Sequence, residues 1–287
     1  MNLSSFDHRG GKSALQFDPH RILPDRDFEH RIGVQSGDIT DVFRGSEDGV
    51  TIHERVAIIE RNPDRHLGLT EQGEILISEA YDLVCNRGIL NRVAHPSVSQ
   101  MLGAFLGGCE QDLVFMRRYS ENSLSMEGAC VAFPSHWDPP SKLGLPLEAI
   151  HQVVPGLQRD IGRNIDQFIQ RMSSDRAYRR SNWGMSCSKE RNNHPALKIP
   201  HLTAKTNIDD ISFRVEDQSL IRLPSGLLFT ITLIRQDLNN VMSDPVASVG
   251  LLRALRTMPE DMARYKGLFE IRPHLISILN KTCRGVE

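Results

Sequence analysis

The feature that most constrains the fold is the order of two hydrophobic patterns in the middle of the chain. Apolar and polar residues alternate in "DLVFMRRYS" and "SLSMEGACVAF", which predicts two strands joined by a short connection. A helical pattern of about five turns follows "VVPG". Its apolar face consists of Leu157, Ile161, Ile165, Phe168, Ile169 and Met172. Alternation then returns in "DISFRVEDQ", "SLIRLP" and "LLFTITLIRQ", which predicts three more strands.

The order of strand, strand, crossover helix and three strands predicts an α+β fold, with an antiparallel sheet and its helices on one side. Sensor domains of the PAS type share this order. Helical patterns flank the sheet, from Glu71 onward and after Asp244, whose neighbour is a proline. We therefore expect an N-terminal irregular and helical wrap over residues 1–109, a PAS-like core over 110–240 and C-terminal helices over 241–287.

Composition excludes several classes of protein. The chain has 287 residues, 39% of them hydrophobic, and a formal net charge of −2. This near neutrality argues against nucleic acid as a partner, and no segment is apolar enough to span a membrane or to form a signal peptide. The five cysteines are widely spaced, which argues against disulfides and zinc sites. We expect a cytoplasmic globular protein.

A line of polar side chains occurs in "FRVEDQSLIRLPSG". Strand alternation places Arg214, Glu216 and Gln218 on one face, while the apolar residues between them face the other way. Such a line can be a solvated sheet face. It can also be a pocket wall, in which Glu216 offers a carboxylate to a cationic substrate and Arg214 or Arg222 neutralises an anionic group of a cofactor.

His151 stands in the apolar stretch "PLEAIHQVVPG", between two prolines. One interpretation is a core histidine bonded to a backbone carbonyl. The other is an iron ligand, because burial lowers the pKa of the imidazole and keeps a lone pair available. His194 and His201 are further candidate ligands, in polar loops. Trp183 is either a core residue or a flat wall against a planar cofactor.

Common nucleotide-binding and hydrolase motifs are missing from the sequence, including G-x-G-x-x-G, G-x-x-x-x-G-K-S/T, H-E-x-x-H and G-x-S-x-G. If the protein performs redox chemistry, we expect the electrons to come from an external donor or from peroxide.

Four separated motifs carry a resemblance to a known family. The segments "VAFPSHW", "KLGLPLEAIHQVVPG", "SNW" and "FRVEDQSLIRLPSGLLFTI" resemble, in this order, the heme-dependent oxidative N-demethylases, over residues 110–236. The resemblance implies a PAS-like sheet that binds heme b through a histidine and oxidises an amine with oxygen. It also implies that flavin and iron–sulfur proteins on other chains supply the electrons.

Position by position, the resemblance implies roles for five residues. His151, in the "IHQVVP" motif, is our choice of iron ligand, with His194 as the alternative. Arg214 and Arg222 would pair with the heme propionates, and Glu216 and Gln218 would face the space where oxygen and substrate meet. "RLPSG" lacks a residue that many members carry before the glycine, which leaves the substrate open.

We therefore expect a heme-dependent monooxygenase that oxidises a nitrogen centre of a small cationic substrate. Our first expectation is N-hydroxylation of a guanidine or amine such as L-arginine, as in the related heme-dependent arginine N-hydroxylases of D-cycloserine biosynthesis. The alternatives are oxidative N-demethylation of a small methylamine, a PAS-type heme sensor without turnover, and a binding module without cofactor.

Overall fold

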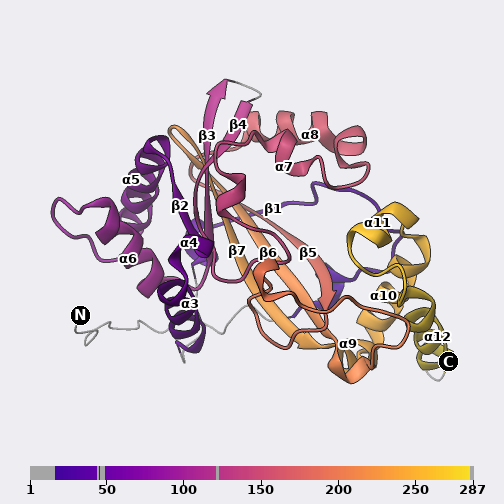
Figure 1. Ribbon diagram of the computed structural model, residues 1–287. Helices are drawn as coiled ribbons and strands as arrows, with labels where there is room; N and C mark the ends of the chain where they lie inside the picture. Colours follow the sequence, from indigo (N-terminus) through magenta and orange to yellow (C-terminus); the bar gives the residue numbers. More distant parts are fainter. Residues whose placement is uncertain (1–16, 44, 46–48, 121–122, 285–287) are drawn as a thin grey trace.

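The computed structural model describes residues 17–43, 45, 49–120 and 123–284. Its centre is a seven-stranded antiparallel sheet with the strand order β1-β5-β6-β7-β3-β4-β2 (Figure 1). The strands are β1 Gln35–Gly37, β2 Leu67–Leu69, β3 Asp112–Ser120, β4 Ser123–Cys130, β5 Ala177–Ser186, β6 Ser212–Leu223 and β7 Gly226–Asp237. The predicted α+β class with an antiparallel sheet is confirmed.

The five long strands β3 to β7 form a PAS-type sheet, because the last of them, β7, pairs with the first, β3. The crossover from β4 to β5 contains α7 Leu147–His151 and α8 Leu157–Arg171. Of the three strands predicted after the crossover, the first two are one continuous strand, β6, since its pairing with β7 runs without interruption from Ser212 to Leu223. The prediction missed β5, because "AYRRSNWGMS" has few apolar residues to alternate.

The N-terminal helices are α1 Pro19–Ile22, α2 Ile39–Val42, α3 Val50–Arg61, α4 Pro63–His66, α5 Glu71–Asn86 and α6 Val98–Gly108. The helix predicted from Glu71 is confirmed, as is the cap at Ser97, whose side chain forms a capping box with Gln100. The sequence did not predict α3. Its buried contacts come from Arg55 and Ile59, so it lacks a continuous apolar face. The first 16 residues of the expected wrap lie outside the described ranges.

The C-terminal helices are α9 Leu238–Ser243, α10 Pro245–Thr257, α11 Glu260–Tyr265 and α12 Arg272–Arg284. Asp244 caps α10 by accepting from the backbone N–H groups of Val246 and Ala247. Three short 3-10 turns lie in the loops: Pro140–Lys142, Pro195–Leu197 and Ile208–Asp210. In the part of the chain that the structure describes, no helix is long and apolar enough to cross a membrane.

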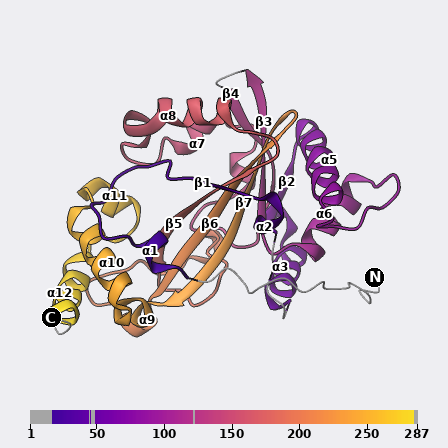
Figure 2. The same cartoon turned by 180° about the vertical axis from the view of Figure 1, so that it is seen from behind.

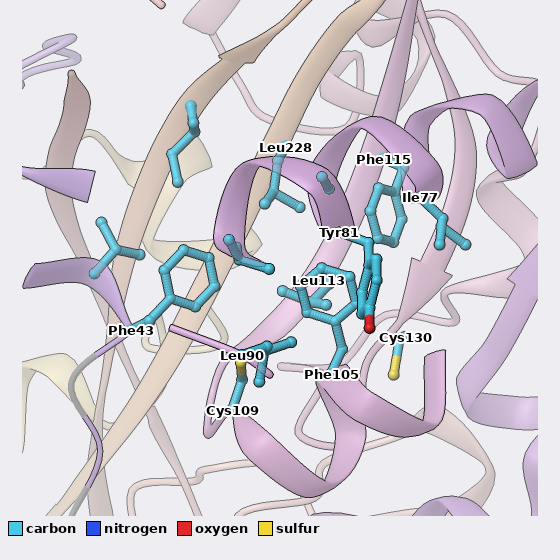
Figure 3. Close-up of a cluster of buried hydrophobic side chains, with 14 of the residues drawn as sticks. Phe43, Ile77, Tyr81, Leu90, Phe105, Cys109, Leu113, Phe115, Cys130 and Leu228 are labelled. Carbon is cyan, nitrogen blue, oxygen red and sulfur yellow. The ribbon is translucent and has the colours of Figure 1, made fainter. Parts of the chain in front are cut away.

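The two faces of the sheet differ in their cover. We call the face that carries Glu216 the site face and the opposite one the back face. On the back face, α3, α5 and α6 pack on β3 and β7 around Phe115 and Leu228 (Figure 3), and α9 to α12 pack on Phe213 and Val215. On the site face, α8 packs over one end of the sheet. The crossover helices therefore lie on one side of the sheet, as predicted, and the N- and C-terminal helices cover the other.

The segment from α1 to α2, which includes β1, runs across the side of the molecule that is turned toward the viewer in Figure 2. It joins the sheet where β1 pairs with the first three residues of β5, opposite Ala177 to Arg179. From Arg180 onward, β5 has no strand on its outer side in the described part of the chain. This leaves the outer edge of β5 open to side chains from the C-terminal helices.

Candidate functional site

The site face is open over the middle of the sheet. Along β6 the burial alternates: Glu216, Gln218, Leu220 and Arg222 are half-buried on the site face, while the residues between them are buried on the back face. An antiparallel sheet can leave one face open to solvent, even at an interior strand such as β6. The half-buried line therefore marks a place where a ligand can contact the sheet.

Glu216 is held from one side only. Its Oε2 accepts hydrogen bonds from Gln218 Nε2 at 2.9 Å and from Asn182 Nδ2 at 3.3 Å. Asn182 stands directly opposite Glu216 on β5, so the pairing of the two strands creates this contact. Oε1 has no hydrogen-bond partner among the described residues. The carboxylate is thus oriented by two amides and keeps one oxygen for a ligand.

Lys266 lies in the turn after α11 and reaches Asn182 and Trp183 around the open edge of β5. Its Nζ donates to the backbone oxygen of Trp183 at 2.7 Å and to Asn182 Oδ1 at 3.2 Å. Burial lowers the pKa of Lys266 to about 8, although the nearby Glu216 carboxylate opposes this. Burial and Glu216 also raise the pKa of Tyr265. Neither residue was predicted, because nothing in the sequence indicates that this turn packs against β5.

Arg180 is the second cation of the site and was also missed. It stands opposite Gln218 in the β5–β6 pairing, so its side chain lies on the site face. Burial lowers its pKa, and the Glu216 carboxylate opposes this. Its Nε is buried without a hydrogen-bond partner. Recognising β5 as a strand would have placed Arg180 beside the predicted polar line.

His151 is the last residue of α7, and the backbone on both sides holds it in place. Pro146 bridges to Ser125 of β4 before α7, and Gly156 takes a left-handed conformation (φ 73°) before α8. Burial is the main cause that lowers the pKa of His151, and the Arg180 charge adds to it. The predicted lowering is therefore confirmed, but Val153, one of the residues expected to bury the ring, is 59% exposed.

Arg214 and Arg222 lie on the site face as predicted, and both donate to protein groups, although Arg214 Nε is buried without a hydrogen-bond partner. Arg214 donates to the backbone oxygens of Glu190 and Arg191 and to Ser135 Oγ, and burial lowers its pKa to about 10. Arg222 donates to the backbone oxygens of Gln170 and Met172 at the end of α8. Both arginines therefore brace loops around the site.

The other predicted residues lie elsewhere. Trp183 faces the back of the sheet, where it stacks on Phe213 with ring centroids 5.5 Å apart. His194 packs edge-on against His66, and its Nδ1 accepts from the backbone N–H of Ala196. His201 is exposed and lines a pocket of about 640 Å³ near Cys187. The structure therefore brings Glu216 and Gln218 together with His151 and Arg180, but not with Trp183.

The residues at this end of the site face suit a heme. The imidazole of His151 has no hydrogen-bond partner in the described ranges, and its lowered pKa keeps it neutral, as a metal ligand must be. Partly buried apolar side chains from α7, α8, β6 and β7 lie at this end of the sheet: Leu147, Ile150, Ile165, Phe168, Leu220 and Phe229. Arg180 supplies a cation for acidic substituents. No cluster of three or more metal-ligating side chains occurs in the described part of the chain.

The fold and the site together define a PAS-like protein. One face of its sheet is open and carries both polar and apolar side chains. Residues 86–276, more than half of the chain, match the model of a family described as haem-dependent oxidative N-demethylase, alpha subunit-like. The chain belongs to this family, as the motifs predicted. The family is named for a haem-dependent oxidoreductase, and its name favours N-demethylation over the N-hydroxylation that we expected first.

Proposed function

We propose that this chain is the heme-binding and substrate-oxidising component of an oxidative N-demethylase that acts on a small cationic methylamine. Family membership supports the reaction. The observation that carries the substrate class is Glu216, a carboxylate that two amides orient from one side and whose other oxygen lacks a partner among the residues that the structure describes. An ammonium group at Glu216 would form a charge-assisted hydrogen bond in a partly dehydrated site.

The residues that would hold heme are His151 as iron ligand and the apolar side chains of α7, α8, β6 and β7 as its walls. The bound heme would supply the activation of oxygen. Burial and, to a smaller extent, the charge of Arg180 lower the pKa of His151, so the imidazole stays neutral near neutral pH. Acid would therefore weaken heme binding, because a protonated imidazole has no lone pair for iron.

The protein's own groups position the substrate. Glu216 would hold the ammonium, while Asn182 and Gln218 fix the direction of its carboxylate and Lys266 fixes Asn182. The N-methyl carbon would gain one oxygen atom, and the resulting carbinolamine would separate into amine and formaldehyde. With molecular oxygen, this balance requires two electrons and two protons and releases water. A flavin and iron–sulfur reductase on another chain, or peroxide in place of oxygen, would meet this need.

The first experiment tests the heme site. We expect His151→Ala to lose the Soret band and the heme content after reconstitution, while His194→Ala keeps both. The reverse result would assign the iron to His194. If both variants bind heme as the wild type does, the proposed site is wrong.

The second experiment tests the reaction. Heme-loaded protein receives a panel of methylated amines and L-arginine, with peroxide or a reductase system, and mass spectrometry follows the products. We expect formaldehyde and loss of one methyl group. Gain of one oxygen atom without formaldehyde would indicate N-hydroxylation instead. If heme binds but no product forms across the panel, the sensor alternative is correct.

A further inference from the structure

The charges on the site face do not balance. Three cations, Arg180, Arg214 and Lys266, lie close enough to Glu216 for its carboxylate to act on the pKa of each. Lys266 is satisfied by Trp183 and Asn182. Among the described residues, no hydrogen bond or ion pair reaches the guanidinium of Arg180, and its Nε is buried. A half-buried cation with a buried nitrogen and no such partners is costly, so a missing anion is the expected complement.

We propose that Arg180 is the binding site for a carboxylate group of a bound ligand. This inference rests on the proposed function for the identity of the ligands. Two sources have the required chemistry: a propionate of the heme, and the carboxylate of a substrate that carries both a methylamine and an acid, such as an N-methyl amino acid.

The guanidinium geometry favours a carboxylate. The free Nε of Arg180, together with one terminal nitrogen, forms the edge of the guanidinium that binds a carboxylate through two parallel hydrogen bonds. The protein's own carboxylate does not serve this purpose. Glu216 forms no ion pair with Arg180 within 4.0 Å, and two amides share its Oε2.

The neighbouring arginines strengthen the assignment. Arg214 and Arg222, the two predicted from the sequence, donate to backbone oxygens and hold loops and the end of α8. Arg235 pairs with Asp237. Of the arginines on the site face of β5, β6 and β7, Arg180 alone has no hydrogen bond or ion pair to another described residue.

The test compares two pairs of ligands that differ only in their acid groups. The first pair is iron protoporphyrin IX and its dimethyl ester, titrated into heme-free protein by absorption. The second pair is N-methylglycine and dimethylamine, titrated by calorimetry with and without heme. Arg180→Gln removes the charge, and Arg180→Lys keeps the charge but loses the paired donors. Arg163→Gln, at an exposed position on α8, is the control.

We expect the wild type and Arg163→Gln to prefer the acid form in at least one pair, and Arg180→Gln to lose that preference by about tenfold or more, since a charge-assisted pair of hydrogen bonds is lost. A preference in the first pair identifies the propionate, and one in the second identifies a substrate carboxylate. If Arg180→Gln, folded by circular dichroism, shows the wild-type affinities in both pairs, the proposal is overturned.

These binding measurements need no turnover. A protein that binds the acid forms through Arg180 but demethylates nothing would contradict the proposed function and leave this inference standing.

Discussion

Glu216 and Asp217 are neighbours in the sequence, yet β6 directs them to opposite faces of the sheet and to opposite uses. Asp217 points to the back face, where its side chain is 1% exposed. Arg21 binds one of its oxygens at 2.8 Å, and Arg179 Nε binds the other at 2.7 Å. Glu216 points to the site face and is half-buried, with protein donors on a single oxygen.

The difference shows what separates a structural carboxylate from a candidate functional one. Arg21 comes from α1 and Arg179 from β5, so Asp217 ties the N-terminal segment to the sheet. Both of its oxygens accept hydrogen bonds from the protein. Glu216 is also a carboxylate and lies in the same strand, but its Oε1 accepts no hydrogen bond from another described residue. Residue type does not distinguish the two carboxylates, whereas burial and the number of oxygens that protein groups bind do.

The largest expected effect is loss of stability in Asp217→Ala. This change leaves two arginines facing a buried space without their anion, and we expect the free energy of unfolding to fall by about 3–5 kcal/mol. Urea denaturation followed by circular dichroism measures it. Asp209→Ala, at an exposed position, is the control. A loss below about 1 kcal/mol would mean that Asp217 does not hold the N-terminal segment as the structure indicates.

Glu216→Gln is the matching change on the other face. We expect affinity for a small quaternary ammonium probe to fall by about tenfold to a hundredfold, because the Coulomb attraction between the carboxylate and the cation is lost. We expect the free energy of unfolding to change by less than about 1 kcal/mol, because an amide can keep one of the two acceptor contacts. Calorimetry measures the first and urea denaturation the second. Exposed Glu148→Gln should alter neither. If Glu216→Gln unfolds the protein as readily as Asp217→Ala, the contrast between the two carboxylates does not hold.

The sequence allowed one wall of the site to be predicted and not the other. Strand alternation along β6 placed Glu216 and Gln218 on one face, because the two-residue period of a strand is a local property. Asn182 and Arg180 lie opposite them on β5, whose polar sequence hides its strand character. Lys266 follows from tertiary packing alone, since it lies about 80 residues further along the chain, at the open edge of β5.

Elements with local signals were predicted well, and elements that depend on neighbours were not. Caps at Ser97 and Asp244 marked two helices correctly. Helix α3 was not predicted, because the buried residue at its centre is Arg55. This arginine forms an ion pair with Asp112, which is distant in the sequence. The same applies to Arg214 and Arg222: their position on the site face could be predicted, but the backbone oxygens that occupy them could not.

The charge of Lys266 gives a smaller effect with a defined pH dependence. Its pKa is lowered to about 8, so it is protonated below this pH and opposes a cation at Glu216. We expect affinity for the quaternary probe to rise about threefold to tenfold when the pH increases from one unit below this pKa to one unit above. The pKa of Tyr265 is raised, so this phenol stays neutral throughout.

Two variants at this position separate charge from structure. Lys266→Arg should stay charged and show weak, pH-independent binding of the probe, while Lys266→Met should remove the pH dependence at higher affinity. An unchanged pH profile in Lys266→Met would show that another group titrates.

The smallest expected effect concerns Arg222, which shares the site face with Glu216 but resembles Asp217 in having protein partners. It donates to the backbone oxygens of Gln170 and Met172, where α8 ends. We expect Arg222→Gln to lower the free energy of unfolding by about 1 kcal/mol, since two half-exposed bonds to a helix end are lost. Heme affinity should change by less than about twofold, because Arg222 already binds two backbone oxygens through Nη1 and is held at the end of α8. Urea denaturation and an absorption titration with heme measure the two quantities, and Arg222→Lys should recover part of the stability. A tenfold loss of heme affinity would restore the propionate role that the sequence predicted, and it would show that protein partners at a half-buried position can give way to a ligand.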